Sequence, residues 1–218
     1  MPKKPLILAF DTSAAHCAAA LLSGDRIIAS IIEPMAKGQG ERLLGLCGDV
    51  LAQANVAYDD LTAIAVGIGP GNFTGIRISV SAARGLALGL GIPAIGVSQL
   101  EALAYGTDGV VIASVDARQD KMFVQVFGTL DDRAPEMCSA DDLPTIPSRA
   151  DPICIGFQAD MIAALCNGTV SAPRMPLADA IAHIAAGRAS HDNPRPAPLY
   201  LRPADAAPAR DAPPTILP

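Results

Sequence analysis

The stretch IAVGIGPGNFTGIRISVSAARGLALGLGIPAIGV, residues 64–97, decides the fold. The apolar run over 61–69 predicts a buried strand, and AIGV over 94–97 predicts a second one. Between them, apolar residues at helical spacing predict a helix over 76–91, which a glycine and a proline at its end should terminate. A strand, a helix and a strand in this order indicate an α/β protein in which helices cover a sheet.

The rest of the chain shows the same kind of pattern in both halves. The expected strands cover 6–10, 17–22, 26–32, 110–116, 121–127 and 152–156, and the expected helices cover 41–54, 99–104, 159–166 and 177–189. Each half begins with antiparallel strands joined by a hairpin and continues into strand–helix units. This order favours one mixed sheet in each half.

A loop-forming sequence, GTDG at 106–109, divides the two halves. We therefore expect an N-terminal lobe over 1–104, which contains the helix 76–91, and a smaller C-terminal lobe over 105–204. Prolines recur toward the C-terminus and exclude a helix or a central strand there. We expect the remainder, 205–218, to be an extended and partly disordered tail.

The composition favours a cytoplasmic protein that does not bind nucleic acid by itself. The 218 residues carry a formal net charge of −6 and a pI of about 4.9, whereas a protein that neutralises phosphates usually has a basic excess. The five cysteines lack C-x-x-C spacing, which is typical of reduced core residues. The first apolar run ends at Asp11 and predicts a strand instead of a signal peptide, and no apolar run is long enough to span a membrane.

The glycine-rich segment before the helix, GIGPGNFTGIR, is similar to a phosphate-binding loop but matches neither common template. It lacks the lysine of a Walker A loop and the third glycine of a dinucleotide fingerprint. What remains is a tight turn, an N-cap at Asn72 or Thr74, and a helix N-terminus. Its free N–H groups make Gly69, Gly71, Asn72 and Thr74 an anion-capable turn, but the segment is equally consistent with a plain strand-to-helix junction.

A second candidate site, FDTS, follows the first expected strand. Asp11, Thr12 and Ser13 are suited to hold a phosphate or a magnesium-bound water, because hydroxyl and backbone N–H groups contact oxygens while a carboxylate orients the metal. The same three residues are also a good Asx-type turn between two strands. The sequence leaves both interpretations open.

The helix 76–91 is apolar on more than one face, so more than one face should be buried. One face is larger and apolar (Ile76, Val80, Ala83, Ala87, Leu90), a neighbouring face is mainly small (Gly75, Ser79, Ala82, Leu86, Gly89), and a polar stripe carries Arg77, Ser81 and Arg84. The pattern fits a central core helix and fits equally an interface with a partner helix.

Metal and nucleophile chemistry are not indicated. His16, His183 and His191 lie far apart in the sequence and form no ligand motif. A G-x-S-x-G elbow is absent from the sequence. The charged residues in VDARQDKMF, 115–123, are expected at a solvated hairpin tip.

Taken together, ILAFDTS, GERLLGL, the 64–97 stretch with its continuation SQLEALA, and VDARQDKMF resemble the TsaB family, also called YeaZ. The most specific part is GPGNFTGIR at 69–77. The resemblance covers about residues 6–127 and continues weakly to LYLRP at 199–203.

The resemblance implies the two-lobed, ribonuclease H-like fold of the actin, sugar-kinase and Hsp70 group. It implies a non-catalytic subunit in the formation of threonylcarbamoyladenosine, next to the anticodon of tRNAs that read ANN codons. The implied partners are the catalytic paralogue TsaD, in a heterodimer, and the ATPase TsaE, with tRNA bound only through the complex. The resemblance implies no membrane partner, no metal and no cofactor of the chain's own, with ATP or ADP bound only in the complex.

The resemblance also assigns roles to residues. Asp11, Thr12 and Ser13 match the family's phosphate-loop position, which we interpret as vestigial. The metal-binding histidines of the paralogue fall near 38–47, where this chain has GQGERLLGLC and no histidine. The helix 76–91 matches the family's partner-binding element. The expected interface residues are Phe73, Gly75, Ile76, Arg77, Ser79, Ala82, Ala83 and Leu86.

On this interpretation, Ala82→Glu or Leu86→Glu should abolish the heterodimer, while the sequence leaves open whether Arg77 and Arg84 contact the partner or tRNA. Two other functions compete with the partner subunit. One is a small ATPase or kinase that uses FDTS as its phosphate loop. The other is a homodimeric scaffold that pairs through the same helix.

Overall fold

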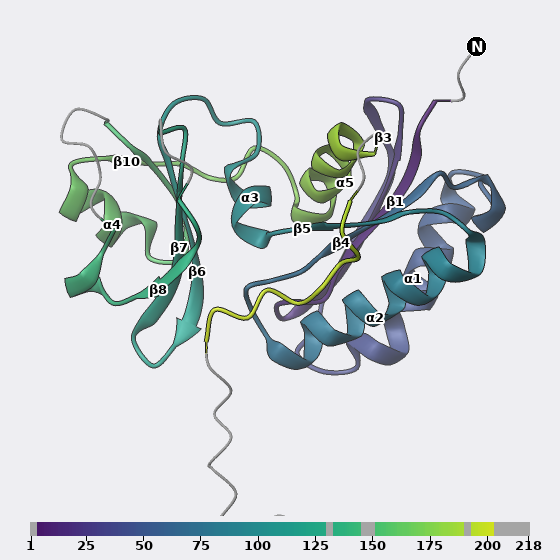
Figure 1. The fold of residues 1–218 in the computed structure, drawn as a ribbon, viewed down its shortest axis with the longest axis horizontal. Coiled ribbons are helices and arrows are strands. Elements are labelled where there is room, and N and C mark those ends of the chain that lie inside the picture. The colour runs from purple at the N-terminus through teal and green to yellow at the C-terminus, as the bar shows by residue number, and fades with distance from the viewer. Residues whose placement is uncertain (1–3, 130–132, 145–150, 190–192, 203–218) are drawn as a thin grey trace, which may run out of the picture.

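The computed structural model describes residues 4–129, 133–144, 151–189 and 193–202, and these form two lobes (Figure 1). Each lobe is built on a five-stranded mixed sheet with helices on its faces. The expected fold class, a two-lobed α/β architecture, is confirmed. In the part of the chain that the structure describes, no helix combines the length and apolarity needed to cross a bilayer.

The first sheet has the strand order β3-β2-β1-β4-β5. Its strands are β1 (Leu6–Asp11), β2 (His16–Ser23), β3 (Arg26–Pro34), β4 (Ala63–Gly67) and β5 (Ala94–Val97). The first three form the expected antiparallel meander, and β4 and β5 then add in parallel beside β1. A short 3-10 helix, Tyr58–Asp60, precedes β4.

Helices α1 (Gln39–Gln53) and α2 (Phe73–Leu90) cover one face of this sheet, and α5 (Leu177–Arg188) covers the other (Figure 1). The alternation along β1 explains both contacts. Leu8 and Phe10 point into the core under α1 and α2, whereas Ile7 and Ala9 point into the core under α5. A strand buried on both faces is therefore apolar throughout, as a central strand of an α/β sheet should be.

The second sheet has the order β10-β9-β6-β7-β8 and repeats the topology of the first. Its strands are β6 (Val111–Arg118), β7 (Lys121–Phe127), β8 (Glu136–Cys138), β9 (Ile153–Gly156) and β10 (Thr169–Val170). Three antiparallel strands are again followed by two parallel ones. A 3-10 helix, Ala140–Asp142, follows β8.

Two helices cover the second sheet, and one of them joins the lobes. Helix α4 (Ala159–Cys166) packs on one face, and α3 (Gln99–Ala104) packs on the other face and also against α5. The expected capping box begins α3: Leu100 N donates to Ser98 Oγ at 3.2 Å, and Ser98 N donates to Glu101 Oε2 at 2.9 Å. Helix α3 thus contacts the second sheet and also α5, which covers the first sheet.

Three sequence-based expectations need correction. Helix α2 begins at Phe73 instead of residue 76, because Asn72 caps it earlier than the apolar pattern starts. The edge strands β8 and β10 were not expected. Helix α5 lies within the range assigned to the C-terminal lobe but packs on β1 and β2 of the first sheet, so the chain returns to the N-terminal lobe. The lobe boundary near residue 105 stays a prediction.

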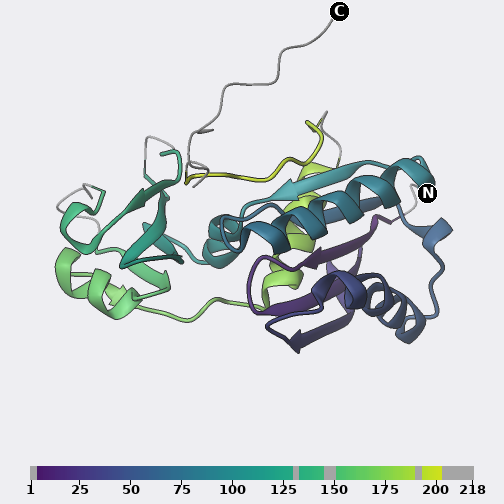
Figure 2. The same ribbon diagram turned by 90° about the horizontal axis from the view of Figure 1, so that it is seen from below.

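After α5, the segment 193–202 runs from the first lobe toward the second without helix or strand, as the prolines predict (Figure 2). Leu199 N donates to Ile68 O at 2.8 Å. At the far end, Arg202 donates to Gln119 Oε1 at 2.6 Å in the hairpin that joins β6 and β7. This segment, which we call the strap, therefore contacts both lobes. The expected tail over 205–218 lies outside the described residues.

Candidate functional site

The glycine-rich loop and the FDTS turn, far apart in sequence, form one tightly packed unit at the carboxyl ends of β1 and β4. Thr12 Oγ1 donates to Gly75 O at 2.7 Å, and Asn72 N donates to Ser13 O at 2.6 Å. Both turn residues are buried. The N-terminus of α2 is therefore fastened to the turn between β1 and β2.

This packing explains the glycines. A Cβ on Gly67 would lie 1.9 Å from Asp11 Oδ2, and a Cβ on Gly71 would lie 2.5 Å from Ser13 O. A Cβ on Gly75 would lie 1.8 Å from Thr12 O. All three distances are far below van der Waals contact, so the loop needs glycine in order to approach residues 11–13. The close contact with residues 11–13 is therefore one reason for these three glycines.

Asp11 is the centre of the hydrogen bonds in this unit. Its Oδ1 accepts from Ser13 N at 2.9 Å and from Ser13 Oγ at 2.8 Å, and it lies 2.8 Å from His16 Nε2. The first two bonds are those of an Asx-type turn, the structural interpretation of FDTS. Asp11 Oδ2 is buried and has no hydrogen-bond partner among the described residues; it packs against Gly67.

The geometry is not that of a serine nucleophile. A catalytic serine must be hydrogen-bonded to its base, with the carboxylate behind that base. Here Ser13 Oγ and His16 Nε2 both contact the same carboxylate oxygen of Asp11, so the carboxylate lies between them. Ser13 is also only 1% exposed. Nearby, burial raises the pKa of the Cys17 thiol to about 11, which disfavours a reactive thiolate.

We expect the Asp11 hydrogen bonds to be structural. Asp11→Ala should lower the free energy of unfolding by about 3 kcal/mol, because the buried N–H and hydroxyl groups of Ser13 lose their acceptor. The measurement is urea denaturation followed by circular dichroism. Asp25→Ala, at an exposed aspartate of the β2–β3 turn, is the matched control and should change stability by less than about 0.5 kcal/mol. Equal stability of the two variants would show that the Asp11 contacts contribute nothing.

The N-terminus of α2 is capped by its own chain. Asn72 Oδ1 accepts from Thr74 N at 3.0 Å and from Gly75 N at 3.1 Å, which confirms Asn72 as the N-cap. The N–H of Asn72 itself is bound to Ser13 O. The N–H groups of Asn72, Thr74 and Gly75 are therefore already hydrogen-bonded within the chain. The first two belong to the predicted anion-capable turn, which comprises Gly69, Gly71, Asn72 and Thr74. Anion binding there stays a prediction that this hydrogen bonding does not favour.

The structure divides the predicted interface residues of α2 into two groups. Gly75, Ile76, Ser79 and Ala83 are buried in the described structure, and the side chains of Ile76, Ser79 and Ala83 pack inside the lobe. This burial does not favour their assignment to an interface, which stays a prediction. Ala82 and Leu86 are half-buried against the core, while Phe73 and Arg77 are exposed. The contacts of Arg77 and Arg84 with a partner or tRNA stay predictions.

The outer face of α1 and α2, which we call the α1/α2 face, carries exposed leucines and glycines beside charged residues such as Glu41 and Arg84. Leu88 on α2 is 82% exposed, and Leu44 on α1 is 52% exposed. Gly48 on α1 and Gly85 and Gly89 on α2 would each place a Cβ in open space. A surface with small residues beside exposed leucines permits close approach by another helix.

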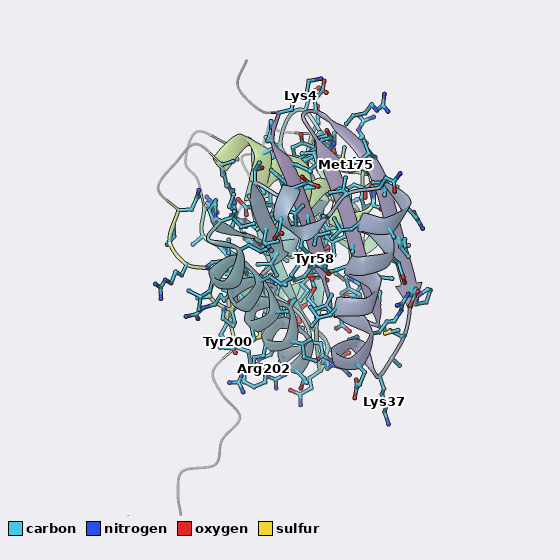
Figure 3. The ribbon with its side chains drawn as sticks, turned by 90° about the vertical axis from the view of Figure 1, so that its right-hand side faces the viewer. Lys4, Lys37, Tyr58, Met175, Tyr200 and Arg202 are labelled. Carbon is cyan, nitrogen blue, oxygen red and sulfur yellow. The ribbon has the colours of Figure 1, made fainter. Side chains whose placement is uncertain are left out.

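An open groove of about 550 Å³ lies at the N-terminal ends of the same two helices. Its lining comes from Gly38–Glu41 of the α1 start and from Asn72, Thr74, Gly75 and Ile78 of α2. Lys37 also lines the groove, and its side chain points outward in Figure 3. The groove continues the α1/α2 face toward the fastened turn.

The strap reaches α2 through a stacked group of side chains. The rings of Phe73 and Tyr200 have centroids 5.0 Å apart, and the Arg77 guanidinium lies 3.7 Å above the Phe73 ring. Arg77 Nε donates to Tyr200 Oη at 2.8 Å. Figure 3 shows Tyr200 and Arg202 near the N-terminal end of α2. The strap therefore fixes two of the exposed residues predicted to face a partner.

Tyr200→Ala should release the strap from α2. We expect amide exchange at Leu199 to accelerate by about tenfold, because its hydrogen bond to Ile68 loses the neighbouring stacking and cation–π contacts. Hydrogen exchange read by mass spectrometry measures this. Tyr200→Phe keeps the ring and removes only the acceptor for Arg77, so its exchange should stay close to that of the parent. Unchanged exchange in the alanine variant would contradict this role.

Sequence reasoning missed His16, Gln99 and Tyr200. Ser13 Oγ lies 3.4 Å from Gln99 Oε1, which brings the start of α3 to the same unit. His16 was foreseeable from the hairpin, because β1 and β2 pair in register from Asp11 and Ala18 and so place residue 16 beside the turn. Among the described residues, no group of three or more His, Cys, Asp or Glu side chains is arranged to hold a metal ion.

Comparison with known proteins places these features in a family. Residues 27–143 match the family described as TsaD: tRNA N6-adenosine threonylcarbamoyltransferase. The chain is 38% identical over 122 residues to the tRNA threonylcarbamoyladenosine biosynthesis protein TsaB of Escherichia coli, a match that covers 54% of this chain and 52% of that protein. The Bacillus subtilis protein of the same name is 34% identical over 156 residues, covering 67% and 68%. The matched segment thus spans about half to two thirds of the length of these relatives.

Solved structures agree with the sequence matches. YeaZ from Pseudomonas aeruginosa has a TM-score of 0.74 at 27% identity, covering 90% of this chain and all of that one. Component A of the (R)-2-hydroxyglutaryl-CoA dehydratase of Acidaminococcus fermentans has a TM-score of 0.54 at 10% identity and covers 86% of this chain and 100% of its own, which shows a shared fold alone. Together with two mixed sheets flanked by helices, these neighbours confirm the fold of the actin, sugar-kinase and Hsp70 group.

Proposed function

Since the chain belongs to the TsaB (YeaZ) family, we propose that it is a non-catalytic partner subunit in the formation of N6-threonylcarbamoyladenosine in tRNA. Its role is to bind the catalytic paralogue TsaD and activate threonylcarbamoyl transfer to the adenosine next to the anticodon of tRNAs that read ANN codons. TsaE joins the complex as its ATPase. ATP or ADP and tRNA are bound only in that complex.

The observation that carries this proposal is the α1/α2 face. It combines exposed leucines with glycines above which nothing lies within 4 Å, on a pair of helices that already share one core. Exposed apolar surface of this kind is expected at sites of association. Hydrogen bonds with the FDTS turn and with the strap hold the beginning of α2 in place.

The interior of the candidate site supports a subunit that leaves the chemistry to its partner. The hydroxyl groups of the FDTS turn hydrogen-bond within the chain, Thr12 Oγ1 to Gly75 O and Ser13 Oγ to Asp11 Oδ1, whereas Asp11 Oδ2 has no partner among the described residues. Asn72 Oδ1 accepts from the N–H groups of Thr74 and Gly75, two of those that an anion at this helix N-terminus would use. We therefore propose that the phosphate loop is vestigial and that its remaining function is to position α2.

Reconstitution tests the proposal. Purified TsaD, TsaE, the adenylate-forming enzyme, unmodified tRNA, threonine, bicarbonate and ATP are combined with and without this chain, and modified nucleoside is measured after tRNA digestion. Modification should require the chain. Equal yields without it would refute the proposal, as would brisk ATP hydrolysis by the isolated chain. Light scattering on the isolated chain separates a homodimeric scaffold, which persists when TsaD is added, from a chain that exchanges into a heterodimer.

A further inference from the structure

Two cysteine thiols of the second lobe lie close together, outside the site described above. The Sγ atoms of Cys154 and Cys166 are 3.8 Å apart. Cys154 is on β9 and is fully buried, whereas Cys166 is the last residue of α4 and is partly exposed. Cys166 is thus partly accessible to solvent, and the buried Cys154 sulfur lies next to the Cys166 sulfur.

A disulfide requires only a short movement of the two sulfurs. A disulfide has an S–S distance of about 2.0 Å, so the sulfurs must come about 1.8 Å closer than the present 3.8 Å. Cys166 ends its helix, since Asn167 is left-handed with φ 54°. The next residue, Gly168, would place a Cβ 3.2 Å from Cys166 Sγ. A larger residue at position 168 would crowd the Cys166 sulfur, whereas glycine does not.

We propose that Cys154 and Cys166 are a modification site, at which a small disulfide of the glutathione disulfide class oxidises them to a reversible intramolecular disulfide. First, the Cys166 thiolate attacks one sulfur of the small disulfide, forms a mixed disulfide and releases one small thiolate. Then the Cys154 thiolate attacks the Cys166 sulfur and releases the second small thiolate. The two protons lost by the protein thiols are taken up by the released thiolates.

Accessibility and acidity set the order of these steps. Cys154 is fully buried, so the external disulfide reaches Cys166 first. Burial, with Cys166 as the second cause, raises the pKa of the Cys154 thiol to about 12, so Cys154 acts only after Cys166 has become a mixed disulfide held next to it. The disulfide would join the end of α4 to β9, and β10 begins three residues after Cys166. We expect it to raise the melting temperature by about 5–10 °C.

The test uses the full chain without substitutions. It is incubated with glutathione disulfide, alkylated, and cleaved at Met161, which lies between the two cysteines in the sequence. We expect the two fragments to stay joined until a reductant is added. Because two of the five cysteines are joined, three should be alkylated after denaturation, and all five after reduction. A mixed disulfide that persists on Cys166, a disulfide between two chains, or five free cysteines would each overturn the proposal.

Variants identify the roles of the two thiols. Cys154→Ala should stop at a stable glutathione adduct on Cys166, and Cys166→Ala should leave Cys154 unmodified. Cys138→Ala removes another buried cysteine of the same lobe and should form the bond as the parent does. An adduct on Cys154 in the Cys166→Ala chain would contradict the order of attack. The result for the parent chain decides the proposal even where a variant folds poorly.

Discussion

Gly75→Ala should lower the free energy of unfolding by about 3 kcal/mol, a large fraction of the stability of an ordinary domain. The added methyl group would lie 1.8 Å from Thr12 O and 2.9 Å from Thr12 C, and both are backbone atoms that cannot rotate away. The turn at 11–13 and the start of α2 must therefore separate. The same movement breaks the bond from Thr12 Oγ1 to Gly75 O. Urea denaturation followed by circular dichroism measures the change.

Gly85→Ala is the matched control on the same helix. Gly85 is exposed, and its added Cβ would meet nothing within 4 Å. Because alanine is the better helix former, this variant should be more stable than the parent by about 0.5–1 kcal/mol. The two substitutions are chemically identical and should have opposite signs. If both stabilised the chain, the close approach of α2 to the FDTS turn would not exist in solution.

The local elements of this fold could be predicted well because their signals are local. The capping box at Ser98 and Glu101 and the left-handed Gly91 after α2 are read from a few adjacent residues, and both are confirmed. The short strands β8 and β10 could not be predicted. They are defined by pairing with β7 and β9, and two or three residues carry no periodicity of their own.

The site was harder to predict because it depends on contacts between distant segments. Gly67, Gly71 and Gly75 are visible in the sequence, but the reason for them is residues 11–13, which lie more than fifty positions earlier. The two apolar faces of α2 were also visible. The sequence does not say which of the two faces packs against the sheet. In the structure it is the face that carries Ile76 and Ala83, so these two are core residues. In the same way, alanine-rich α5 gives no indication of which sheet it covers.

The placement of the partner on the α1/α2 face can be tested with one exposed leucine. Leu88→Glu should weaken the complex with TsaD by about 100-fold or more, because a buried carboxylate without a partner charge is costly in an apolar interface. The isolated chain should keep its stability within about 0.5 kcal/mol, since Leu88 is 82% exposed. Isothermal titration of the purified subunits gives the affinity. Ala82→Glu and Leu86→Glu are less informative, because both side chains pack partly against the core and would also report on folding.

Leu165→Glu is the control for this experiment. Leu165 is 59% exposed on α4, in the second lobe, and receives the same change of size and charge. If TsaD binds the α1/α2 face, the Leu165→Glu chain should bind TsaD with the affinity of the parent. The difference in affinity between the two variants then depends only on where the glutamate is placed. Equal losses would indicate a general effect of added negative charge on a chain that already carries −6. Full affinity of the Leu88→Glu chain would exclude the C-terminal end of α2 from the interface. An interface that buries Leu88 would lose affinity when a glutamate replaces it.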